Sequence, residues 1–278
     1  MTESSHSTSS SSAVPSAAVP SVAPSAAPGH LRRAVVTGAS SGIGAATVCK
    51  LRADGWDVVA VARRTDRLEA LAAQTGAVPF TADVTDDGAV AALQTFVAGR
   101  GGLDTLVNIA GGARGADKMA DGMQDDWDWM YRVNVLGTMR MIRAFLPALR
   151  GHGAGTVLNL TSTAGIEAYE GGSGYNAAKF AQHALTKALR LEEVENNLRV
   201  IEVLPGMVHT EEFALNRLSG DTAAAQKTYA GVDKPLTAGD VADVVAYALN
   251  LPHHINLDQI VVRPVAQAAA HKVIRSGS

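Results

Sequence analysis

The stretch Thr37-Gly38-Ala39-Ser40-Ser41-Gly42-Ile43-Gly44 decides how this chain folds, because it joins a short apolar run, 33–37, to a helical period. Gly38 allows a tight turn, Gly42 lets the backbone approach a ligand, and Gly44 lets the helix pack closely on the strand. A helix that starts there is suited to bind a dinucleotide pyrophosphate, although a plain strand-to-helix turn is the alternative. The residues expected at the ligand are Gly38, Ser40, Ser41, Gly42, Ile43 and Gly44.

Short apolar runs and longer helical periods continue to alternate after this turn, which is typical of βαβ units on a parallel sheet. Strands are predicted at 33–37, 57–61, 77–81, 105–108, 155–161, 199–204 and 256–262. Helices are predicted at 44–53, 66–74, 86–98, 137–149, 175–196 and 238–249. The pattern predicts one α/β domain, 31–278, with a doubly wound, seven-stranded parallel sheet of the Rossmann type and helices on both faces.

Two segments depart from this alternation. Residues 1–30 hold ten Ser, six Ala and four Pro, with Glu3 the only Asp, Glu, Lys or Arg, so we expect a disordered tail. The tail lacks the basic and apolar regions of a secretory signal. Residues 207–233 contain small and polar side chains and no predicted strand, which indicates a helical insertion or lid over a site.

Composition excludes several classes of function. The chain has 278 residues, 47% of them hydrophobic, and a net charge of −3, so there is no basic surface to attract nucleic acid or a membrane. No run of apolar residues is long enough for a transmembrane helix. The single cysteine, Cys49, cannot form an internal disulfide, and His253-His254 lacks further ligands at metal-binding spacing. We therefore expect a cytoplasmic protein without a metal site.

The end of the second predicted strand reads Ala62-Arg63-Arg64, where an enzyme that uses NAD would place an Asp or Glu for the ribose hydroxyls. A carboxylate there would repel a 2′-phosphate, whereas a guanidinium makes a charge-assisted contact with it. The pair Arg63 and Arg64 therefore predicts NADP(H), and a solvated basic pair at a strand end is the alternative.

Two later strand ends offer weaker signals of the same kind. Asp83-Val84 follows the third strand, and Asp83 is either an acceptor for the adenine amino group or a cap for the next helix. Asn108, Ala110 and Gly111 follow the fourth strand and bring an amide and small residues to the other side of the cofactor.

The strongest group of residues is Ser162, Tyr175 and Lys179. Tyr175 and Lys179 are four residues apart, which places them on one face of a helix, and Ser162 follows the fifth strand at the edge of the sheet where ligands bind. A nearby ammonium favours the phenolate of a tyrosine, so Tyr175 is a candidate proton acceptor for an alcohol. An ordinary surface pair is the alternative for Tyr175 and Lys179 taken alone.

Together these motifs resemble the short-chain dehydrogenase/reductase family over residues 31–266. The resemblance implies that Tyr175 is the catalytic acid/base, that Lys179 lowers its pKa and holds the nicotinamide ribose, and that Ser162 orients the substrate. It also implies that Asn134 supports a water-linked proton relay. Pro205, Gly206, Val208 and Thr210 match the segment that holds the nicotinamide carboxamide. Ile109 stands where the family usually has a second asparagine, and we expect a local adjustment with catalysis intact.

Residues 205–213, together with the tail at 256–267, are similar to the NADP-dependent 3-hydroxy acid dehydrogenases, which act on serine or allo-threonine. The resemblance implies a small-molecule alcohol or carbonyl substrate and a homotetramer, or a homodimer. A ketone or aldehyde reductase whose substrate carries no carboxylate stays open, as does a non-catalytic protein that senses NADP.

Overall fold

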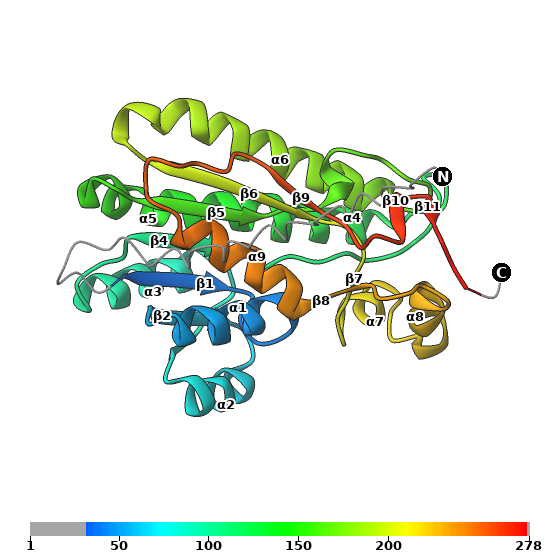
Figure 1. The fold of residues 1–278 in the computed structure, drawn as a ribbon, viewed down its shortest axis with the longest axis horizontal. Coiled ribbons are helices and arrows are strands. Elements are labelled where there is room, and N and C mark those ends of the chain that lie inside the picture. The colour runs from blue at the N-terminus through cyan, green and yellow to red at the C-terminus, as the bar shows by residue number, and fades with distance from the viewer. Residues whose placement is uncertain (1–31, 277–278) are drawn as a thin grey trace, which may run out of the picture.

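A computed structural model describes residues 32–276, and its central feature is a parallel sheet of seven strands in the order β3-β2-β1-β4-β5-β6-β9 (Figure 1). The strands are β1 (Arg33–Thr37), β2 (Asp57–Ala62), β3 (Val78–Thr81), β4 (Thr105–Asn108), β5 (Thr156–Leu160), β6 (Arg199–Pro205) and β9 (Ile260–Val262). The order changes direction between β1 and β4, and such a switch point is where doubly wound sheets bind ligands. The predicted fold class is confirmed.

The two faces of the sheet are buried by two sets of helices, because successive side chains of a strand point to opposite faces. In β1, Val36 belongs to a core with α1 (Gly42–Ala53), α2 (Thr65–Thr75) and α9 (Ala238–Asn250). Its neighbour Val35 belongs to a second core. That core includes residues of α3 (Asp87–Gly99), α5 (Thr138–His152) and α6 (Ser173–Glu193).

Several predicted boundaries need correction. The predicted strand 256–262 forms a strand only at β9, because the carbonyl of Asp258 accepts a hydrogen bond from Arg190 (2.7 Å) and the Asn256 amide binds the Asp258 carboxylate. The helix predicted to begin at 137 is preceded by α4 (Gln124–Tyr131) and by a π-helical turn, Arg132–Gly137. The predicted helix 175–196 ends in a short 3₁₀ turn, Val194–Asn196.

Residues 207–233 contain two helices, α7 (Phe213–Arg217) and α8 (Thr222–Tyr229), as the sequence predicts. The expectation that this insertion lacks a strand is wrong. It begins with β7 (Val208–His209), which pairs with β8 (Leu236–Thr237), and the Leu236 amide donates to the Met207 carbonyl (3.2 Å). This short ladder fixes both ends of the insertion, and Figure 1 shows α7 and α8 beside β7 and β8, away from the central sheet.

The chain after β9 folds back as a small ribbon of β10 (Gln267–Ala269) and β11 (Lys272–Val273). Within residues 32–276 no helix is both long and apolar enough to span a membrane. The predicted tail, residues 1–30, lies outside the part of the chain that the structure describes.

Candidate active site

The glycine-rich turn after β1 has the tight geometry that its sequence predicts. Gly38 has φ of 70° and Gly42 has φ of 51°, in the left-handed region that favours glycine. A Cβ on Gly44 would lie 2.1 Å from the carbonyl oxygen of Gly38, and one on Gly38 would lie 2.9 Å from the Ala110 nitrogen. Side chains at Gly38 or Gly44 would therefore push β1, β4 and α1 apart.

The N-terminus of α1 fits an anionic group. Its N-cap residue, Ser41, makes no side-chain capping bond, and the first turn holds no acidic residue. The free amides and the helix dipole at such a terminus attract negative charge. Ser40, Ser41 and Ile43 lie at this terminus, so the turn can hold a pyrophosphate.

The structure explains the unusual residue Ile109. The Thr37 hydroxyl accepts hydrogen bonds from the amides of Ile109 (3.0 Å) and Ala110 (3.1 Å). The Ile109 side chain packs against the core that contains α1 and α9. The loop after β4 is thus held through its backbone, and an apolar side chain at 109 is accommodated by packing.

The two arginines after β2 differ in position. Arg64 reaches the glycine-rich turn, where its Nη2 donates to the hydroxyls of Ser40 (2.9 Å) and Ser41 (3.0 Å). The side chain of Arg63 is 66% exposed and lies 3.9 Å from Asp83. Arg67, three residues further on in α2, also turns toward the site and was not found from the sequence. Arg64, Ser40 and Ser41, together with Arg67, therefore form a cationic cluster whose hydrogen-bond donors suit a ribose phosphate.

The residues at the next strand ends lie at the same edge of the sheet. The Asp83 carboxylate accepts hydrogen bonds from the amide and hydroxyl of Thr85, both at 2.8 Å. The alternative that Asp83 caps the next helix is wrong, because Asp86 is the N-cap of α3. Val84 is buried against Gly137, and Asn108 is buried and donates to Asn159 (2.9 Å).

The four candidate catalytic residues come together from three parts of the chain. Asn134 lies in the π-helical turn, Ser162 follows β5, and Tyr175 and Lys179 lie in the first turns of α6. The Lys179 ammonium is 5.7 Å from the centre of the Tyr175 ring. Ser162 lies near enough to the Tyr175 hydroxyl to lower its pKa. Gly111 lies against Asn134 and Lys179, since a Cβ there would be 2.5 Å from the Asn134 amide oxygen and 3.6 Å from Lys179 Nζ.

Burial dominates the electrostatics of this group. It raises the pKa of Tyr175, the nearby Tyr169 adds to the rise, and Ser162 and the positive charge of Arg217 oppose it. Burial lowers the pKa of Lys179 to about 7, against a smaller opposing effect of the buried Glu202 carboxylate. Arg217 is thus a further cation that acts on Tyr175. The expected role of Lys179 in lowering the pKa of Tyr175 stays a prediction.

Two polar residues that the sequence analysis missed connect Lys179 to Asn134. Lys179 donates to the Gln182 amide oxygen (2.8 Å), Gln182 donates to the Thr138 hydroxyl (2.9 Å), and Thr138 donates to the Asn134 carbonyl (2.8 Å). Gln182 and Thr138 are buried. The Asn134 side-chain nitrogen donates to the Gly112 carbonyl (2.9 Å), and the Gly112 amide donates to the Asn134 side-chain oxygen (3.1 Å). Gln182 lies three residues after Lys179 in α6, and this spacing is the one signal by which the sequence could have indicated it.

The segment after β6 lies over the same edge of the sheet. The Pro205 carbonyl accepts a hydrogen bond from the Ser162 hydroxyl (3.4 Å), and the Gly206 amide donates to the Val262 carbonyl (2.7 Å). The Val208 carbonyl accepts a hydrogen bond from the Tyr229 hydroxyl (3.0 Å). A Cβ on Gly42 would lie 3.5 Å from the Thr210 side chain, so Thr210 packs against the glycine-rich turn.

The insertion also touches the candidate catalytic residues through two side chains that the sequence analysis did not single out. The Phe213 ring packs edge-on against the Tyr175 ring, with 5.9 Å between centres. Arg217 donates to the Tyr169 hydroxyl (2.8 Å) and to the carbonyls of Gly171 (2.9 Å) and Gly115 (3.1 Å). The insertion is thereby held against the loops on both sides of Tyr175.

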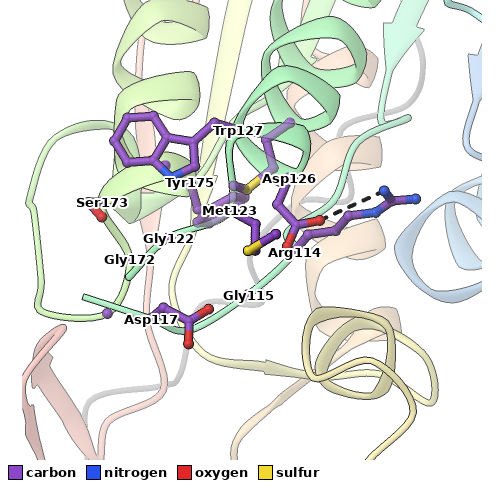
Figure 2. A pocket seen from close by; sticks show the side chains of 13 residues that line it. Arg114, Gly115, Asp117, Gly122, Met123, Asp126, Trp127, Gly172, Ser173 and Tyr175 are labelled. Atoms are coloured by element: carbon purple, nitrogen blue, oxygen red, sulfur yellow. Dashed lines mark ion pairs between the residues drawn. The ribbon is translucent and has the colours of Figure 1, made fainter. Parts of the chain in front are cut away.

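A small pocket of about 20 Å³ opens beside Tyr175, between the loop after β4 and the start of α6 (Figure 2). Figure 2 shows the Asp126 carboxylate turned toward Arg114, at 3.9 Å. Residues that line the pocket include Arg114, Gly115, Asp117, Met123, Asp126, Trp127, Met130, Ser173 and Tyr175. No group of three or more His, Cys, Asp or Glu side chains suited to a metal occurs between residues 32 and 276.

Comparison with known proteins identifies the family. The short chain dehydrogenase family matches residues 32–218. An uncharacterised oxidoreductase of Mycobacterium tuberculosis is 52% identical over 87% of this chain and 94% of its own length. The NADP-dependent 3-hydroxy acid dehydrogenase of Schizosaccharomyces pombe is 36% identical over 87% of this chain and 95% of its own. The closed form of a serine dehydrogenase complexed with NADP⁺ is 32% identical, with a TM-score of 0.83 over 87% of this chain and 99% of that one.

The sheet order thus agrees with the comparisons, which show the same fold and family. The chain belongs to the short-chain dehydrogenase family, and it is an oxidoreductase of that family.

Proposed function

We propose that this protein interconverts a secondary alcohol and a carbonyl compound with NADP(H), and that Tyr175 is its acid/base residue. The observation that carries the proposal is the position of Tyr175, which is buried and lies near both Ser162 and Lys179. When bound, the nicotinamide supplies the hydride acceptor or donor. A sensor of NADP without catalysis would not need this set of residues.

The residues of the chain handle the proton and hold the substrate. In oxidation the Tyr175 oxygen, as phenolate, takes the hydroxyl proton, and in reduction the same phenol returns it to the forming alkoxide. The Ser162 hydroxyl holds the substrate oxygen beside Tyr175. The chain of hydrogen bonds from Lys179 through Gln182 and Thr138 to the Asn134 carbonyl fixes the Lys179 ammonium in place.

The cationic cluster of Arg64, Arg67, Ser40 and Ser41 supports NADP over NAD. Guanidinium groups bind a phosphate through charge-assisted hydrogen bonds, and the two residues directly after β2, Arg63 and Arg64, offer no carboxylate for ribose hydroxyls. The names of the S. pombe relative and of the serine dehydrogenase complex support the same cofactor.

For the substrate, the position of Arg217 favours a 3-hydroxy acid such as serine or allo-threonine. Its guanidinium carbon is 5.9 Å from the centre of the Tyr175 ring, so a carboxylate could bind Arg217 while the hydroxyl lies at Tyr175. The names of the two related enzymes point to the same class. A ketone or aldehyde reductase is the second candidate, because Phe213, Trp127 and Met130 give the region around Tyr175 apolar surface as well.

A panel of L-serine, L-allo-threonine, 3-hydroxyisobutyrate and neutral alcohols and ketones, followed by the absorbance of the reduced cofactor, tests the proposal. Tyr175→Phe should bind NADP and lose about 10²–10⁴-fold in turnover. Arg217→Gln should raise KM for a hydroxy acid by about 10–150-fold, the value of a hydrogen bond to a charged group, and should leave neutral substrates unchanged. An equal loss for both substrate classes would mean that Arg217 only holds the insertion.

A further inference from the structure

One carboxylate of the insertion is bound by the cationic cluster of Arg64, Arg67, Ser40 and Ser41. Glu212, the residue before α7, binds Arg64 with both oxygens, at 2.8 and 2.9 Å, and binds Arg67 at 2.7 Å. Its side chain is 21% exposed, less than either arginine. Glu212 is thus held by two guanidinium groups that lie 148 and 145 residues away along the chain.

The groups that hold Glu212 are the groups that would hold a ribose phosphate. Arg64 also binds the hydroxyls of Ser40 and Ser41, and the hydrogen bonds of Arg64 and Ser41 lower the pKa of Glu212. A phosphate seeks the same donors as this carboxylate. Two anions cannot share one pair of arginines at hydrogen-bonding distance without strong repulsion.

We propose that Glu212 is a specificity-determining residue that competes with the 2′-phosphate of NADP for Arg64 and Arg67. The proposal rests on the proposed use of NADP(H). Binding of NADP must displace the Glu212 carboxylate from the two arginines. The cost of this displacement reduces the binding free energy that the phosphate contacts provide. NAD has a ribose hydroxyl at this position, and a carboxylate is the usual acceptor for that hydroxyl, so NAD can bind with Glu212 in place.

The competition also has a structural consequence for the insertion. Glu212 holds its near end to α2, while Arg217 holds α7 to the loops beside Tyr175. Binding of the 2′-phosphate therefore breaks the contact of Glu212 with α2 and leaves the contacts of Arg217 intact. A ligand without that phosphate leaves both sets of contacts intact.

Isothermal titration calorimetry on the full chain tests the competition without turnover. The ligands are NADP, NAD, adenosine 2′,5′-bisphosphate and adenosine 5′-monophosphate, and the proteins are wild type, Glu212→Gln and the control Glu211→Gln, which changes the exposed neighbouring carboxylate. We expect Glu212→Gln to bind NADP and the bisphosphate about fivefold or more tightly, the value of about 1 kcal/mol for a partly exposed ion pair. Binding of NAD and of the monophosphate should not tighten, and Glu211→Gln should behave as wild type.

Each other outcome counts against a defined part of the proposal. Equal or weaker binding of the bisphosphate by a Glu212→Gln protein with unchanged melting temperature would overturn the competition and leave the use of NADP intact. An equal gain for all four ligands would show a general opening of the site and would also overturn it. If neither wild type nor variant binds NADP or the bisphosphate, both the inference and the proposed cofactor fail.

Discussion

Lys179 is a buried lysine whose ammonium donates to the Gln182 amide oxygen and approaches the Leu160 carbonyl at 3.5 Å. Two neutral acceptors do not replace the hydration that the ammonium loses, and the nearest buried carboxylate, Glu202, compensates only in part. The pKa of Lys179 therefore falls to about 7, close to the pH at which the proposed reaction would run.

This lowered pKa predicts how stability changes with pH. Between pH 7 and about 10, where a lysine in an unfolded chain is still protonated, the unfolded state binds one more proton than the folded state at this position. The free energy of unfolding should therefore rise with pH in this window, by at most about 1.4 kcal/mol per pH unit from Lys179. Chemical denaturation at several pH values measures this slope.

Lys179→Met should remove this contribution to the slope, because methionine does not titrate. Lys187→Met is the matched control, since Lys187 is an exposed lysine on the same helix. An identical slope in wild type and Lys179→Met would show that Lys179 keeps its charge in the folded protein.

Single residues also show what a sequence can and cannot predict about a site. Ser162, Tyr175 and Lys179 could be found because their spacing within one strand–helix unit already places them together. Glu212 and Arg217 could not, because their partners lie 148 and 48 residues away and depend on how the insertion folds back. The sequence does not distinguish the roles of Arg63 and Arg64. The structure shows that, of the two, it is Arg64 that reaches the glycine-rich turn.

At the scale of elements, the strands and the first helix were predictable because each has a strong local pattern. The exceptions have longer-range causes. The predicted strand included residues 256–259, but Asn256 and Asp258 are poor strand formers and the Asp258 carbonyl accepts a hydrogen bond from Arg190 of α6. The π-helical turn that carries Asn134 depends on bonds from the Asn134 side chain to Gly112 and Met130, which no local pattern reveals.

The junction of β1 and α1 allows a sharp test of element packing. Gly44→Ala would place a Cβ 2.1 Å from the Gly38 carbonyl oxygen, and the surrounding backbone would have to move. We expect a loss of about 1–3 kcal/mol in the free energy of unfolding, as for other overpacked sites. Gly99→Ala in α3 meets no atom within 4 Å and should be neutral or stabilising by up to about 1 kcal/mol. Equal effects of the two variants in urea denaturation would contradict the close packing of α1 on β1.

At the scale of the whole molecule, the surface beside β9, at the edge of the central sheet, exposes several apolar side chains. β9 is an edge strand, and Val261 in it is 44% exposed. Val265 is fully exposed and Ile274 is 74% exposed, and both line a groove with Asp233 and Lys234 at the end of the insertion. Edge strands and apolar patches of this kind are usually covered in a native protein. This surface supports the prediction of a homotetramer or homodimer.

Assembly through this surface would also bear on the active site. The last described residues bind the end of the insertion, since the Ser276 amide donates to the Gly231 carbonyl (2.7 Å) and Arg275 donates to the Thr228 carbonyl (3.0 Å). A neighbouring copy seated on Val265 and Ile274 would press this segment against α8. Assembly would then limit the movement of the insertion that carries Glu212 and Arg217.

Val265→Asp tests this assembly, because a charge placed at a fully exposed position should not harm the monomer but should be costly to bury at an interface. We expect light scattering after gel filtration to show an oligomer for wild type and a smaller species for Val265→Asp. Met119→Asp is the control, since Met119 is 71% exposed in the loop before α4 and far along the chain from the edge strand. A monomeric wild type, or an unchanged mass for Val265→Asp, would contradict an interface at β9 and leave the apolar surface there without a role in assembly.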